Sequence, residues 1–330
     1  MAVYTDLGTE RLAELIAAYD VGDLVSAKGI AEGVSNSNWL IETSGKDGGP
    51  RKDSAQSARF ILTMYERRIE TADLPFFLDL LDHLSAADCP VPRTIHDGEG
   101  ASFRMVEGKA VALIEFLPGV SPTAPSAAQA RAVGVALARM HAAAQAFPGS
   151  RVNDLGPQEN SATLESCGSA ALAQIDPDLP EVLPRARAVA EAWPSDLPRS
   201  IIHSDLFPDN VLMLGDRVSG LIDFYFACHD TMAYDLAVTH AAWCFSKDGS
   251  RFDAALGHAL VGGYESVRPL GPRERDALPL LAEGACLRFV ASRAQDWIET
   301  PAGALVIRKD PMDFVRRWNT YRDLGQEAFA

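Results

Sequence analysis

Over the first 117 residues, apolar and polar positions alternate along short stretches, and this period of two predicts strands. Strands are expected at 24–28, 38–43, 59–66, 102–108 and 109–117. Apolar residues at helical spacing predict a short helix at 9–19 and a longer one at 74–88. A tip rich in Gly, Ser and Asn at 29–37 joins the first two strands. This part is therefore predicted to be a small, mainly antiparallel sheet with one main helix.

After residue 119 the spacing of apolar residues changes to the helical period. Helices are predicted over 126–145, 179–194 and 275–297. One hairpin, with a turn at Gly215 and Asp216, is embedded among them. The whole chain is therefore expected to have an α+β fold in which the second part is larger and mostly helical.

Composition narrows the class of protein. A chain of 330 residues is expected to form two domains or lobes. Its 45 acidic and 30 basic residues give a net charge of -15, which disfavours nucleic-acid and anionic-membrane partners. The five cysteines are scattered without a C-x-x-C pair, as expected of free thiols in a reducing compartment. With no secretory signal and no apolar run long enough to span a bilayer, we expect a cytoplasmic protein.

The stretch "IIHSDLFPDNVLML" places polar residues between two apolar segments. A surface turn would explain these residue types, and so would a loop that carries chemistry. Asp223 follows Asn210 by 13 residues, and a hairpin would bring the two to the same end, where their oxygens suit Mg²⁺. Asp205 precedes Asn210 by five residues, which is the spacing of a kinase catalytic loop.

"HSDLFPDN" followed by "LIDF" resembles the H-x-D-x-x-x-x-N and I-D motifs of the aminoglycoside phosphotransferase and choline kinase superfamily. The resemblance implies ATP and Mg²⁺ as cofactors, Asp205 as the catalytic base, and Asn210 and Asp223 as metal ligands. His203 would brace the loop. "GVALARMH" resembles the superfamily's helical G-x-x-L-A-x-x-H signature, and "YDLA" resembles the segment whose Asp235 supports the loop.

The same resemblance implies a bilobal, protein kinase-like fold. A nucleotide-binding lobe would span 1–115, a hinge 116–119, and a helical catalytic and substrate-binding lobe 120–330. The hinge segment "ALIEFLPG" makes the backbone of Glu115 and Leu117 the expected adenine contacts. The residues expected near the phosphates are Gly33, Ser35, Ser37 and Thr63.

Thr63 departs from the superfamily, which generally carries a basic residue at this position of the third strand. Arg67 or Arg68, two Mg²⁺ ions, or the serines of the 29–37 tip are the alternatives for the missing charge. An inactive nucleotide-binding protein is a further alternative. An ordinary Asp pKa near 4 would keep Asp205 ionised at neutral pH without special tuning.

Five longer segments resemble the homoserine kinase branch: "RFILTMYERR", "LPFFLDLLDHL", "HSDLFPDNVLM", "IDFYFACHDTMAYDLA" and "LRFVASRAQDW". The resemblance implies L-homoserine as the acceptor. Arg288 or Arg293 would bind its carboxylate, and Asp230 or Glu283 its ammonium group. We expect a monomer or a homodimer, a choice that the sequence does not decide. Aminoglycosides and choline-like cations are rival acceptors, and a metal hydrolase using His203, Asp205 and Asp223 is the alternative from another class.

Overall fold

The computed structural model describes residues 7–30, 36–45, 58–66, 70–301 and 308–330. Its contacts divide the chain into two compact units. The first unit comprises residues 1–119 and 219–225, and the second comprises 120–218 and 226–330. The return of 219–225 to the first unit was not foreseen from the sequence. The predicted hinge role of 116–119 stays a prediction.

The first unit is built on an antiparallel sheet with the strand order β1-β2-β3-β6-β4, and β5 pairs with β6 outside this order. Most of the predicted strands are present. Strand β4 was not predicted, because two residues are too few to show an alternating pattern. Glu107 and Gly108 form the turn between β5 and β6, both at positive φ. The strands are β1 (Leu24–Ile30), β2 (Asn36–Thr43), β3 (Ala58–Tyr65), β4 (Thr94–Ile95), β5 (Arg104–Val106) and β6 (Lys109–Glu115).

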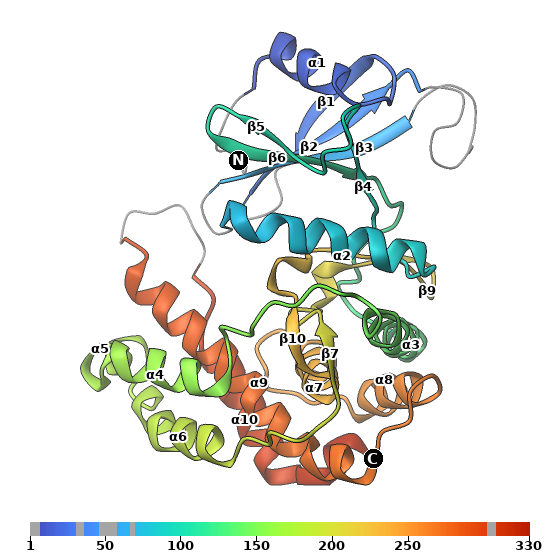
Figure 1. The fold of residues 1–330 in the computed structure, drawn as a ribbon. Coiled ribbons are helices and arrows are strands. Elements are labelled where there is room, and N and C mark those ends of the chain that lie inside the picture. The colour runs from blue at the N-terminus through green and yellow to red at the C-terminus, as the bar shows by residue number, and fades with distance from the viewer. Residues whose placement is uncertain (1–6, 31–35, 46–57, 67–69, 302–307) are drawn as a thin grey trace. The chain divides into compact units, whose positions relative to one another are not determined.

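A helix covers each face of this sheet (Figure 1). Helix α1 (Thr9–Ala17) packs against the face that carries Val111 and Leu113 of β6. Helix α2 (Leu74–Ala86) packs against the opposite face, which carries Ala110 and Ala112. Because successive side chains of a strand point to opposite faces, a strand covered on both sides reads as a continuous apolar run, as β6 does.

The segment 219–225 is held in the first unit by three contacts. The backbone N–H of Leu221 donates to the Pro90 carbonyl at 2.6 Å. The hydroxyls of Tyr225 and Tyr65 lie 3.0 Å apart, and the Tyr225 ring meets Phe77 edge to face at 5.8 Å. The aromatic run at Phe224 to Phe226 is therefore divided, since Phe226 belongs to the second unit.

The second unit is mostly helical and contains the short strand pair β7-β10. The predicted hairpin is the pair β8-β9, of which residues 219–221 are grouped with the first unit. No helix among the described residues is long and apolar enough to cross a membrane. The helices are α3 (Ala127–Ala144), α4 (Pro157–Cys167), α5 (Ser169–Ile175), α6 (Val182–Ala192), α7 (Met232–Trp243), α8 (Ala254–Glu265), α9 (Pro272–Glu299) and α10 (Met312–Leu324). The strands are β7 (Arg199–Ile202), β8 (Val211–Leu214), β9 (Arg217–Leu221) and β10 (Cys228–Thr231).

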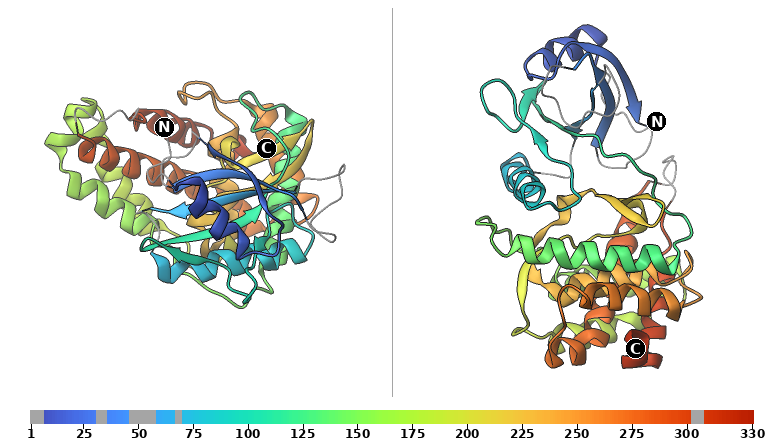
Figure 2. Two further views of the ribbon diagram at one scale, coloured as in Figure 1. Left: turned by 90° about the horizontal axis from the view of Figure 1, so that it is seen from above. Right: turned by 90° about the vertical axis from the view of Figure 1, so that its right-hand side faces the viewer.

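Helices α3 and α8 lie side by side at very short range (Figures 1 and 2). A Cβ placed on Gly134 of α3 would lie 2.1 Å from the Leu260 carbonyl oxygen. One placed on Gly263 of α8 would lie 2.1 Å from the Arg131 carbonyl oxygen. The glycine of the predicted helical signature is therefore required for close backbone packing, and this packing sets the position of α3.

Two neighbouring glycines of α8 allow this packing to be tested. Gly263→Ala should lower the free energy of unfolding by about 1 to 3 kcal/mol, because its Cβ overlaps the α3 backbone. Gly262→Ala is the matched control, since its nearest neighbour is the end of the Arg131 side chain at 3.5 Å. That variant should gain up to about 1 kcal/mol from helix propensity. Equal stability of the two variants in guanidinium unfolding would contradict the close crossing.

Candidate functional site

The loop of residues 203–210, between β7 and β8, is held by one buried carboxylate. The backbone N–H groups of His203 and Ser204 donate to the two oxygens of Asp235, each at 2.7 Å. Asp235 lies on the first turn of α7 and is completely buried. Ser204 has φ 68°, a conformation that is uncommon for residues other than glycine. The Asp235 carboxylate therefore holds the backbone just after β7, where Ser204 has an unfavourable conformation.

Asp235 is in turn held by His141 of α3. His141 Nε2 lies 2.9 Å from Asp235 Oδ2, and its Nδ1 lies 2.8 Å from the Tyr264 hydroxyl. Since a carboxylate only accepts, Nε2 donates to it. Burial alone raises the pKa of Asp235, but the hydrogen bond and charge of His141, with His203, lower the pKa below its usual value. Asp235 is therefore ionised and accepts these hydrogen bonds. The two marked residues of the α3 signature thus have separate functions, because Gly134 allows close packing against α8 and His141 holds Asp235.

Arg288 of α9 holds the same loop from another side. Its guanidinium donates to the carbonyl and hydroxyl oxygens of Ser204. Nη2 also lies 3.7 Å from Asp205 Oδ1, and the group sits 5.2 Å from the Phe226 ring and 5.0 Å from the Phe289 ring. The side chain is only 3% exposed. Arg288 is thus the one substrate candidate within 4 Å of the Asp205 carboxylate, but its guanidinium is already engaged.

Asp205 lies in this loop with its side chain 19% exposed. Burial raises the pKa of its carboxyl, while Arg288, His203 and Lys309 oppose that rise. The sequence-based expectation of an ordinary pKa did not include this desolvation. Neighbouring basic groups therefore contribute to keeping Asp205 charged.

Asn210 is oriented by Asp205. Its Nδ2 donates to the Asp205 carbonyl at 2.8 Å and lies 3.4 Å from the carboxylate. Because the amide nitrogen faces Asp205, the amide oxygen points the other way, where it suits a hard cation. Asp223 lies in the first unit at φ 66°, another uncommon conformation. The predicted meeting of Asn210 and Asp223 at a metal stays a prediction.

The other three substrate candidates have partners elsewhere in the second unit. Asp230 accepts from Asn153 at 2.6 Å. Glu283 accepts from the indole N–H of Trp318 at 2.6 Å. Arg293 donates to the Asp313 carboxylate at 2.9 Å and to the Asp310 carbonyl at 2.8 Å. The structure thus does not bring Asp230, Glu283 and Arg293 into one cluster with Asp205 among the described residues.

The candidates for nucleotide contacts lie in the first unit. Gly33 and Ser35, like Arg67 and Arg68, fall outside the described residues. The Ser37 hydroxyl donates to Glu66 at 2.6 Å, and Thr63 donates to the Asn38 side chain at 2.8 Å. Both Ser37 and Thr63 are buried.

Glu115 ends β6, and its backbone N–H donates to the Arg93 carbonyl at 3.0 Å, while Leu117 follows in the connection to residue 119. Any adenine contact at Glu115 would therefore use its carbonyl oxygen. One cation near β3 was not predicted from the sequence. Lys109 of β6 pairs with Glu66, just after β3 ends.

The fold and the 203–210 loop are those of a kinase-like phosphotransferase, and residues 26–270 match the phosphotransferase enzyme family. The chain is 47% identical to a homoserine kinase of Gluconacetobacter diazotrophicus, covering 98% of this chain and 97% of the relative. It is 46% identical to a homoserine kinase of Caulobacter sp. strain K31, over 98% and 97%. An amicoumacin kinase structure is similar in fold, with a TM-score of 0.67 and 13% identity, covering 97% of this chain and 94% of that one. The chain therefore belongs to the phosphotransferase enzyme family, in its homoserine kinase branch.

Removing the Asp235 charge should loosen the loop. In Asp235→Asn one amide N–H group would face a backbone N–H, so we expect the free energy of unfolding to fall by about 3 kcal/mol. The lowered pKa of Asp235 contributes stability that is present above its unfolded pKa and lost as pH falls through the folded pKa. The variant should therefore lose less stability than the wild type between about pH 4 and pH 2.

Urea unfolding across this pH range measures both effects. Asp216→Asn, the same substitution at an exposed carboxylate of the second unit, is the control and should behave as the wild type. A fully stable Asp235→Asn protein would contradict the anchoring role.

Proposed function

We propose that the protein transfers the γ-phosphate of ATP to the side-chain hydroxyl of L-homoserine, giving O-phospho-L-homoserine and ADP. The observation that carries this proposal is the 203–210 loop, in which Asp235 and Arg288 fix the backbone beside Asp205. The homoserine kinases that resemble the chain over nearly its full length support the choice of acceptor.

Asp205 is the proposed catalytic base. Its carboxylate accepts a hydrogen bond from the acceptor hydroxyl and takes the proton as the hydroxyl oxygen bonds to the γ-phosphorus. The bond from the γ-phosphorus to the bridging oxygen breaks, and its electrons leave with ADP. Little covalent chemistry falls to the protein, so orientation of the hydroxyl by a fixed loop is the main contribution of these residues.

His203 and Asp235 are proposed to support this loop. Asp235 accepts the N–H of His203, and His203 Nδ1 accepts the N–H of Asp205 at 3.3 Å. Trp243 adds a third hold, because its indole N–H donates to the Leu206 carbonyl at 2.9 Å. These bonds surround Asp205 with fixed backbone groups.

Asn210 and Asp223 are the proposed Mg²⁺ ligands. The outward amide oxygen of Asn210 fits a hard cation, because the amide nitrogen is committed to Asp205. Bound Mg²⁺ would neutralise charge on the phosphate oxygens.

The nucleotide is proposed to bind to the first unit through the 29–37 tip, including Gly33, Ser35 and Ser37, and through the backbone of Glu115 and Leu117. Thr63 is the position where the superfamily generally has a basic residue. Lys109, which pairs with Glu66 beside Ser37, is a cation near the end of β3, but it lies on the α1 face of the sheet, whereas Thr63 lies on the α2 face with Ala112.

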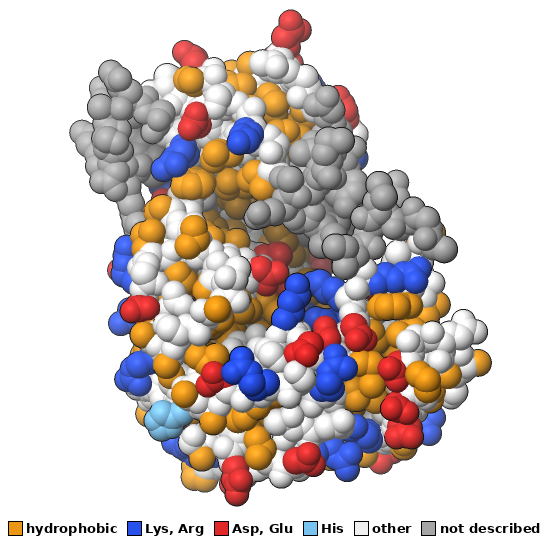
Figure 3. Space-filling view, turned by 180° about the vertical axis from the view of Figure 1, so that it is seen from behind, with side chains coloured by type: hydrophobic (Ala, Val, Ile, Leu, Met, Phe, Trp, Pro, Cys, Tyr) orange, Lys and Arg blue, Asp and Glu red, His pale blue; other side chains and the backbone are white. Residues whose placement is uncertain are grey.

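Other acceptors have less support. A polycationic acceptor would bind best to a surface that is uniformly negative. On the face of the second unit seen in Figure 3, acidic and basic side chains are instead interleaved. The net charge of -15 disfavours nucleic-acid and anionic-membrane partners. Action in the cytoplasm, as a monomer or homodimer, is part of the proposal.

An acceptor panel tests the proposed activity. Purified protein with Mg²⁺-ATP should release ADP in response to L-homoserine, and much less with choline, L-serine, L-threonine or kanamycin. Mass spectrometry should identify O-phospho-L-homoserine as the product. Stimulation by another acceptor and not by homoserine would contradict the substrate, and nucleotide binding without turnover would indicate an inactive protein.

A second test addresses the base. Asp205→Asn should lower kcat by about 100- to 10,000-fold, because the amide cannot take the proton. Nucleotide affinity should stay near that of the wild type, since the proposed nucleotide contacts lie in the first unit. Asp209→Asn, the same change at an exposed carboxylate of the loop, is the control and should retain turnover. Near-normal turnover by Asp205→Asn would remove Asp205 from this role.

A further inference from the structure

One exposed lysine stands just before α10. Lys309 lies just before α10, its side chain is exposed, and it has no ion pair within 4 Å among the described residues. The next residue, Asp310, accepts through its carbonyl from Arg293 of α9, the helix whose Arg288 lies 3.7 Å from Asp205.

The residues on both sides of Lys309 are engaged in contacts. Arg308 donates to the carbonyl of Thr300 and sits 5.5 Å from the Trp297 ring. Asp310 accepts through its carbonyl from Arg293 at 2.8 Å, and its carboxylate accepts the N–H of Met312 at 2.9 Å. Lys309 is therefore an exposed side chain between two residues that are both engaged in contacts.

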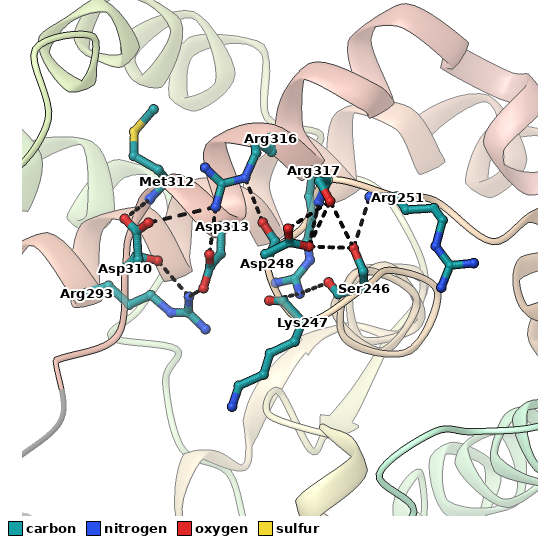
Figure 4. Close-up of polar contacts among 11 residues, drawn as sticks. Ser246, Lys247, Asp248, Arg251, Arg293, Asp310, Met312, Asp313, Arg316 and Arg317 are labelled. Carbon is teal, nitrogen blue, oxygen red and sulfur yellow. Dashed lines mark hydrogen bonds and ion pairs between the residues drawn. The ribbon is translucent and has the colours of Figure 1, made fainter.

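A wider polar network holds the start of α10 (Figure 4). Arg316 donates to the Asp313 carboxylate at 2.8 Å and to the Asp248 carbonyl at 2.6 Å. Asp313 also accepts from Arg293 of α9 at 2.9 Å. The side chain of Lys247, in contrast, extends away from this network (Figure 4).

Aromatic rings join this network to the 203–210 loop. Phe207 meets Phe289 of α9 edge to face at 4.9 Å, and its centroid lies 6.2 Å from that of Phe314 in α10. Phe289 and Phe314 are 4.7 Å apart. These ring contacts pack the first turn of α10 against the loop that carries Asp205.

An amino-acid acceptor needs a cation for its carboxylate. In L-homoserine three carbon atoms separate the hydroxyl oxygen from the carboxylate carbon, so a hydroxyl at Asp205 places the carboxylate in the same neighbourhood. Arg288 is buried and engaged with Ser204, and Arg293 is engaged with Asp313. Among the described residues, Lys309 is an exposed cation of this region without such an engagement.

We propose that Lys309 binds the α-carboxylate of the amino-acid acceptor and thereby selects it over amino alcohols that lack this group. The proposal rests on the proposed function, because it assigns a residue to that acceptor. Lysine suits this task as a compact charge on a long, adaptable stem. The assignment replaces Arg288 and Arg293 as partners of the substrate carboxylate.

Two acceptors that differ only in the carboxylate test the proposal. L-homoserine and 3-aminopropan-1-ol share the hydroxyl, the carbon chain and the amino group. In Lys309→Met we expect kcat/KM for L-homoserine to fall by about 10- to 100-fold, mainly through KM, because a charge-assisted bond is lost. The value for 3-aminopropan-1-ol should stay within about threefold of the wild type, and Lys309→Arg should restore most of the homoserine activity.

Lys247→Met is the matched control, since Lys247 is an exposed lysine of the same unit without an ion pair among the described residues. It should keep the wild-type ratio of the two acceptors. Equal losses of Lys309→Met on both acceptors, or no loss on either, would overturn the assignment while leaving the kinase activity in place. A wild-type protein that phosphorylates neither compound would overturn the proposed function, and the role of Lys309 with it.

Discussion

The hydrogen bonds from two successive backbone N–H groups to the buried Asp235 carboxylate are the constraint on which the site depends. They hold Ser204 in a conformation that few residues other than glycine adopt. A buried carboxylate is costly unless it is fully hydrogen-bonded, and His141 supplies the remaining partner. The position of His141 depends in turn on α3, which crosses α8 at two glycines. Packing far from the loop therefore determines where Asp205 points.

Arg288 holds the same loop through acceptor groups. Asp235 binds the N–H side of the loop, whereas Arg288 binds the carbonyl and hydroxyl of Ser204. The same guanidinium places positive charge near Asp205, whose burial would otherwise favour the neutral acid. One arginine thus links the geometry of the loop to its electrostatics. Arg288, which the sequence suggested as a substrate ligand, thus also holds the loop in place.

Features that depend on local spacing could be predicted from the sequence. The strands, the main helices, the turn at Gly215 and the H-S-D loop all follow from short patterns, and the family resemblance linked Asp235 to that loop. Features that depend on tertiary contacts could not. The burial of Asp205, the engagement of Arg288 and Arg293, and the placement of Lys309 all require that α9 and α10 be positioned first. Thr63 shows the same limit, since its bond to Asn38 depends on strand register.

The central claim is that a fixed loop presents Asp205 to the acceptor hydroxyl. A crystal structure of the protein with Mg²⁺, a non-hydrolysable ATP analogue and L-homoserine tests it most directly. The account predicts that the homoserine hydroxyl oxygen lies about 2.6 to 3.2 Å from an Asp205 carboxylate oxygen, with both bonds to Asp235 intact. A hydroxyl beyond hydrogen-bond reach of Asp205, facing a different base, would contradict it.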